Sequence, residues 1–185
     1  MKKIIYFVAI IATTLVQTAF AQHVHGNETK SAAPADKMMS KDQLSEVVSA
    51  YLSLKNALAK DDSKTAQESA QTFVAELNKV PETQMTTEQH TVWIKNMKKL
   101  TYDAQHISEN ELEHQREHFV TLSKNMYEVV KAFGTGTTTL YYQFCPMAND
   151  GKGAYWLSEK EKISNPYMGK KMPTCGSSKE TLSAK

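Results

Sequence analysis

The chain has 185 residues, 41% of them hydrophobic, and a formal net charge of +2 at pH 7. That length suits a single domain with a core of its own, and the near-neutral, interleaved charge argues against a nucleic-acid-binding protein. Seven glycines argue against a fold rich in sheets and turns.

Residues 1–21 contain the three parts of a secretory signal: a basic start, a short apolar run and an end of small residues. Lys2 and Lys3 precede an apolar run over 4–16, and Ala19 and Ala21 follow it. The run is too short to span a bilayer of about 30 Å as a helix. We therefore expect cleavage after Ala21 and export to a periplasm, with no stable membrane insertion.

Residues 22–39 are polar and poor in core-forming side chains, so we expect a flexible tail. The tail includes His23 and His25, and short tracts with histidines can also bind metal ions. It therefore has two interpretations, a leader without structure or an additional metal-binding segment.

Four amphipathic segments follow, each with apolar residues at helical spacing. We expect helices over about 41–60, 64–80, 87–106 and 109–133, all within one helical domain over 40–185. Polar residues able to cap a helix precede or open each segment: Ser40, Ser63, Thr86 and Ser108. Gly134 suits the end of the last helix. Short connections between helices of similar length predict antiparallel neighbours.

Residues 137–183 differ from the helices in composition. The segment 137–144 is β-branched and aromatic and predicts a strand, and 154–157, after a turn, predicts its partner. Asn165-Pro166-Tyr167 predicts a fixed turn, because Asn bonds its own backbone and Pro sets φ. The expected fold is therefore mainly α: an antiparallel four-helix bundle with a small C-terminal β-hairpin and irregular loop.

Sulfur donors gather in this C-terminal segment. Both cysteines lie there, with Met147 close to Cys145 and Met172 close to Cys175. Thiolate and thioether are soft ligands that favour Cu(I), so these four residues are candidate metal ligands. Met168 lies in the same segment, and its alternative role is to pack against the helices. The alternative is a Cys145–Cys175 disulfide, which is common in exported proteins. Both interpretations require the two cysteines to lie together.

Histidines form a second candidate group. His114 and His118 are four residues apart and share one helix face, where two imidazoles can bind one ion. His106 lies just before the turn between the last two helices, which brings it near His114. The alternative is a solvated polar face beside Glu113 and Glu117. The chain from His118 to Cys145 is long enough to double back, so a mixed site of histidine and sulfur ligands is one arrangement.

The C-terminal motifs resemble the DUF3347 family of exported Bacteroidetes proteins, over roughly residues 41–183. The motifs that carry the resemblance are Cys145-Pro146-Met147, Trp156-Leu157-Ser158, Asn165-Pro166-Tyr167 and Cys175-Gly176. The same domain is attached to periplasmic adaptor subunits of heavy-metal efflux systems of the copper and silver type. Cys-Pro-Met is also similar to the start of heavy-metal-binding domains in copper transporters, although Ala148-Asn149 stands here where those domains have His-Pro. The resemblance implies Cys145, Met147, Cys175 and Met172 as metal ligands.

The resulting hypothesis is a periplasmic protein that binds Cu(I) and buffers it or passes it to an efflux partner. The rival hypothesis is a structural or interaction module, pinned by a Cys145–Cys175 disulfide, that docks on an adaptor or envelope protein. The sequence has no nucleophile–base–orienter set, phosphate loop or nucleotide fingerprint, so we do not expect an enzyme.

Overall fold

The computed structural model describes residues 44–184. The predicted signal, the predicted tail and the predicted Ser40 cap lie outside these residues. Within residues 44–184, no helix combines the length and the apolar character needed to cross a membrane.

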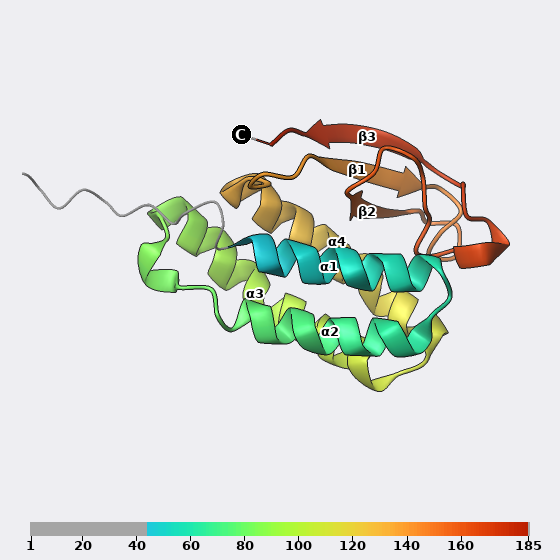
Figure 1. Cartoon of the computed structure of the whole chain (residues 1–185), viewed down its shortest axis with the longest axis horizontal. Helices are drawn as coiled ribbons and strands as arrows, with labels where there is room; N and C mark the ends of the chain where they lie inside the picture. The colour runs from blue at the N-terminus through green and yellow to red at the C-terminus, as the bar shows by residue number, and fades with distance from the viewer. Residues whose placement is uncertain (1–43, 185) are drawn as a thin grey trace, which may run out of the picture. The chain divides into compact units, whose positions relative to one another are not determined.

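Four helices precede a small sheet (Figure 1). The helices are α1 (Ser45–Ala59), α2 (Ser63–Leu77), α3 (Thr87–Glu109) and α4 (Leu112–Phe133). The strands are β1 (Leu140–Cys145), β2 (Ala154–Ser158) and β3 (Ser177–Leu182), and two short 3-10 helices are η2 (Glu82–Gln84) and η3 (Gly169–Lys171). The prediction of a mainly α fold with four helices and a small C-terminal sheet is confirmed.

Capping side chains set the starts of α2 and α3. The predicted Thr86 cap of α3 is confirmed and forms a capping box: the Gln89 N–H donates to Thr86 Oγ1 at 3.2 Å, and the Thr86 N–H donates to Gln89 Oε1 at 3.0 Å. The predicted Ser63 cap is wrong, because Asp62 caps α2 by accepting from the Thr65 N–H at 3.0 Å. An ionised Asp accepts two bonds at this position, and the Thr65 hydroxyl supplies the second at 2.7 Å.

The turn between α3 and α4 lies later than predicted. Ser108 stays inside α3, where its hydroxyl donates to the Gln105 carbonyl at 2.7 Å and so cannot cap a following helix. Buried Gln115 of α4 closes the turn, since its amide donates to the carbonyls of Asn110 at 2.8 Å and Ile107 at 3.2 Å. These bonds satisfy carbonyls that the end of α3 leaves unpaired. Gly134, with φ of +88°, ends α4 as predicted.

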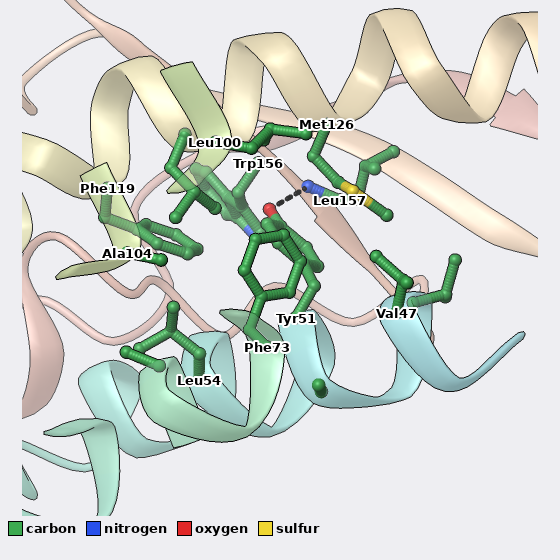
Figure 2. Packing of buried hydrophobic residues seen from close by; sticks show 14 of the residues in the cluster. Val47, Tyr51, Leu54, Phe73, Leu100, Ala104, Phe119, Met126, Trp156 and Leu157 are labelled. Carbon is green, nitrogen blue, oxygen red and sulfur yellow. Dashed lines mark hydrogen bonds between the residues drawn. The ribbon is translucent and has the colours of Figure 1, made fainter. Parts of the chain in front are cut away.

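The sheet packs on the helices through β2, which lies against α1 and α4. Figure 2 shows the core between them, where Tyr51 of α1 is fully buried. The Tyr51 hydroxyl accepts from the Leu157 N–H of β2 at 3.0 Å and pairs with the Ser123 hydroxyl of α4 at 2.8 Å. One phenol therefore ties two helices to the sheet.

A third strand replaces part of the predicted irregular loop. The sheet is antiparallel in the order β2-β1-β3, so β1 is central and β3 is an edge strand. β3 reads Ser-Ser-Lys-Glu-Thr-Leu and is mostly exposed, so it lacks the apolar alternation that predicts a strand. Its Glu180 carboxylate accepts from the ammonium of Lys131 at 2.6 Å and from the phenol of Tyr127, both on α4.

Candidate metal centre

Three imidazoles converge where α3 and α4 meet at their tight turn. His106 comes from the last turns of α3, and His114 and His118 from the first turns of α4. One ring nitrogen of each lies within 4.8 Å of the others, which is the spacing that lets three ligands hold a single ion. The rings of His106 and His118 stack with centroids 4.4 Å apart, and the His114 ring lies 4.7 Å from that of His118.

Carboxylates orient two of these rings. Nδ1 of His118 lies 2.9 Å from Oδ1 of Asp103, a residue of α3 that is only 5% exposed. The Thr121 hydroxyl donates to the other Asp103 oxygen at 2.6 Å. Nδ1 of His114 lies 3.1 Å from the Glu117 carboxylate. Because Nδ1 of both His114 and His118 contacts a carboxylate, Nε2 is the nitrogen of each ring that is left to bind an ion. This arrangement is common among histidine ligands of metals.

The cluster is open on one side. The side chain of His118 is 17% exposed and that of His114 is 44% exposed. The ring of Tyr102 covers another side, with centroids 4.4 Å from His106 and 5.7 Å from His118. Three protein ligands with an accessible fourth position characterise sites that exchange their ion or bind a further ligand. Imidazole suits zinc, copper, iron and nickel.

The structure also brings the two cysteines together. Both are free thiols, with Cys145 buried at the end of β1 and Cys175 half-buried just before β3. The neighbouring Cys145 thiol, together with burial, raises the pKa of Cys175, while the Met147 N–H acts in the opposite direction. A thiol with a raised pKa keeps its proton more firmly.

Asn165 holds the loop that carries Cys175. Its amide donates to the Cys175 carbonyl at 2.8 Å, while its oxygen accepts from the N–H groups of Tyr167 at 2.8 Å and Met168 at 3.0 Å. The predicted turn at Asn165-Pro166-Tyr167 is confirmed, and it fixes the position of one of the two thiols.

The methionines do not all lie together. Met147 is 57% exposed and shares with Met168 a cavity of about 780 Å³ that is also lined by Glu113 and Glu117 of α4. Met172 is half-buried and does not line this cavity. Its carbonyl accepts from the Cys175 N–H at 3.3 Å, so it stays close to the thiol through its backbone.

The candidate ligands therefore fall into two groups rather than one mixed site. The three-residue group with ligand atoms in mutual reach contains His106, His114 and His118, and no cysteine. Glu113 and Glu117 line the Met147 cavity, while Tyr102 contacts His106 and His118. Among residues 44–184, no group joins a cysteine to these histidines at one ion.

A comparison with protein families gives a match over the helical part of the chain. A family model described as "Protein of unknown function (DUF3347)" matches residues 47–138. Over these residues the chain belongs to the DUF3347 family. No significant match is found among curated proteins or among solved structures.

The family match covers the histidine group of this DUF3347 protein but not its cysteines. Residues 47–138 include most of α1, all of α2 to α4 and all three clustered histidines. They stop short of Cys145, Cys175 and the sheet, so the match is narrower than the span of 41–183 expected from the C-terminal motifs.

Sequence reasoning found His114 and His118 from their spacing and His106 from its place before the turn, but it missed Asp103. The signal was present, because Asp103 precedes His106 by three residues and so shares its helix face. His90 lies outside the cluster near the start of α3, with Nε2 3.5 Å from the Glu82 carboxylate.

Proposed function

We propose that this DUF3347 protein binds a metal ion at His106, His114 and His118. The observation that carries the proposal is the convergence of three ring nitrogens within 4.8 Å, one of them oriented by a buried carboxylate. Charged carboxylates that do nothing else are seldom buried, so the placement of Asp103 behind His118 supports a site rather than a chance grouping on a polar face.

We propose copper as the ion. Three imidazoles suit Cu(II), and the adjacent thiols of Cys145 and Cys175 suit Cu(I), so the two groups together match both oxidation states of one metal. The backbone N–H of Met147 lies beside the Cys175 thiol, and its exposed thioether is a further soft donor. Copper is a metal that both groups can bind, as Cu(II) at the imidazoles and as Cu(I) at the thiols.

The role we propose is to buffer copper outside the cytoplasm or to pass it to an efflux partner. The predicted secretory signal and the resemblance to domains on efflux adaptor subunits support this location and this partner. The exposed side of the histidine cluster supports exchange, since an ion with an open coordination position can be taken up and released without unfolding. The protein is proposed to carry ions and not to turn over a substrate.

Metal titration of the purified protein tests the proposal. Protein freed of metal with a chelator is titrated with Cu(II), Zn(II) and Ni(II), and native mass spectrometry counts the ions bound. One Cu(II) ion with the electron paramagnetic resonance signature of nitrogen ligands is expected. His114→Ala and His118→Ala should each lose it, whereas the matched control His90→Ala should retain it. Equal binding by all three variants would assign the ion to another part of the chain.

A second function, a structural module fastened by a Cys145–Cys175 disulfide, is favoured by one observation. Both thiols are free, and Cys145 is near enough to Cys175 to shift its pKa, so the two cysteines are neighbours, as a bridge requires. Thiol titration of protein taken from the periplasm separates the two functions. Two free thiols that Cu(I) protects support copper binding, and an intact bridge with no copper uptake at either group supports the module.

A further inference from the structure

A groove of about 640 Å³ runs between α3 and α4, next to the histidine cluster (Figure 1 shows the two helices). Its lining includes four lysines, two acids and one tyrosine: Lys95, Lys98, Lys99, Lys124, Asp103, Glu128 and Tyr102. The lysines outnumber the acids, so the groove carries a net positive charge.

The carboxylates of the groove are already engaged. Glu128 accepts from Lys95 at 2.8 Å, and this ion pair lowers the pKa of Glu128. Asp103 accepts from the Thr121 hydroxyl and faces His118. Lys98, Lys99 and Lys124 form no ion pair with any other residue in 44–184. Three exposed ammonium groups therefore face the groove without a counter-charge within ion-pair distance.

Exposed apolar surface accompanies these charges. Tyr102 is 56% exposed and Ile94 is 52% exposed, and both lie on α3, eight residues apart with Lys98 midway between them. Residues spaced by four on a helix share a face, so Ile94, Lys98 and Tyr102 form one stripe. Large exposed side chains beside unpaired charges are typical of surfaces that bind another molecule.

We propose that this groove binds an acidic segment of a partner protein. Carboxylates of the segment would pair with Lys98, Lys99 and Lys124, and an apolar residue would pack on Tyr102. A protein segment fits better than nucleic acid, because the groove offers an exposed tyrosine ring for an apolar side chain and no arginine fork for phosphate.

The groove adjoins the histidine cluster through Tyr102 and Asp103, because Asp103 lines the groove and contacts His118. Tyr102 lines the groove and its ring contacts both His106 and His118. A partner in the groove would therefore sit one aromatic ring away from the ion. Such a partner would be placed to receive the ion. That delivery rests on the proposed function, whereas docking itself does not.

Binding of a short fluorescent peptide in which glutamates alternate with phenylalanines tests the docking. The protein is used in chelator without metal, so the result is independent of metal binding. Fluorescence anisotropy is measured for the wild type, for Lys98→Glu/Lys99→Glu/Lys124→Glu, and for the matched triple variant Lys64→Glu/Lys152→Glu/Lys162→Glu, whose positions are exposed and do not line the groove. Thermal melting checks that all three are folded.

The groove variant should bind the peptide at least about tenfold more weakly, and the control triple within about twofold of the wild type. Affinity should also fall as salt rises, because the ion pairs are exposed. Equal losses in the two triple variants, or no peptide binding by the wild type, would overturn the proposal. Binding of phosphatidylglycerol vesicles that the groove variant alone loses, without peptide binding, would assign the groove to a membrane surface and would also overturn it.

Discussion

Oδ1 of Asp103 lies 2.9 Å from Nδ1 of His118, so a buried carboxylate on α3 holds an imidazole that belongs to α4. The same carboxylate accepts from Thr121, one turn further along α4. The contact fixes both the tautomer and the orientation of the ring. It also makes the geometry of the histidine cluster depend on the packing of two helices rather than on either helix alone.

Asp103→Asn tests the importance of this contact. The amide keeps the size of the side chain but loses the negative charge that favours the Nδ1–H tautomer. We expect metal affinity to fall by about 10-fold to 100-fold, the usual loss when such a partner is removed. Isothermal titration calorimetry measures the affinity. Glu128→Gln, which removes a carboxylate of α4 that is bonded to Lys95, is the control and should leave the affinity unchanged.

Gly169→Ala should destabilise the protein through the loop that precedes Cys175. Gly169 has φ of +50°, and an added Cβ would overlap the Asp61 carboxylate and the Arg116 guanidinium. Arg116 also donates to the carbonyls of Pro166 and Leu58, each at 2.8 Å, so it fastens the loop to the end of α1. We expect a loss of about 2–3 kcal/mol in the free energy of unfolding, measured in urea.

Gly134→Ala is the matched control for that change. Gly134 also has a positive φ, +88°, but no atom lies within 4 Å of the added Cβ. The substitution should cost only the backbone strain, about 1–3 kcal/mol, because φ of +88° with ψ of 175° is a conformation that almost only glycine adopts. A Gly169→Ala loss no larger than this would show that the Asp61 and Arg116 side chains move aside without penalty.

The sequence indicates the helical part of the fold because each helix has its own local signals. Thr86 and Gln89 form a capping box three residues apart, and Gly134 supplies the positive φ that ends α4. The start of α4 was misplaced because the buried amide of Gln115 closes the turn through bonds to α3 that local spacing does not show. The strand β3 was missed because its pairing with β1 is set by position and not by composition.

The candidate site, too, could be predicted from the sequence only in part. A four-residue spacing placed His114 and His118 on one face, and the turn brought His106 to them. The mixed site of histidine and cysteine ligands was wrong. It rested on the length of the chain from His118 to Cys145, and a length shows only the distance that a segment can span. The direction in which Cys145 points depends on the register of β1 with β2, where it stands opposite Ala154.

Acid should weaken the protein through Asp61. A hydrogen bond from Arg116 lowers the pKa of Asp61 below its usual 3.8, an effect that burial opposes and the Lys170 N–H assists. A carboxylate with a lowered pKa in the folded state stabilises the fold above its unfolded value, and that contribution is lost as pH falls through the lowered pKa. We therefore expect the melting temperature to fall below about pH 4. Asp61→Asn should flatten this dependence, and an unchanged pH profile would assign the acid sensitivity to other carboxylates.

Cys145→Ser/Cys175→Ser separates the two candidate metal groups. The double change removes both thiolates, so uptake of Cu(I) should be lost, while Cu(II) should still bind the histidines because none of them contacts a cysteine in the cluster. Because Cys175 holds its proton through Cys145, Cu(I) binding should release protons in lightly buffered solution, and the double variant should release none.

The same variant requires a stability control, since Cys145 is fully buried and serine places a more polar group there. A cost of about 1–3 kcal/mol is expected in the free energy of unfolding, with helix content by circular dichroism unchanged. Met147→Leu keeps the volume of an exposed side chain and removes only the thioether, so it should weaken Cu(I) binding without that cost. Cu(I) uptake that survives the double cysteine change would place the soft-metal site away from the sulfur pair and leave the thiols to the disulfide alternative.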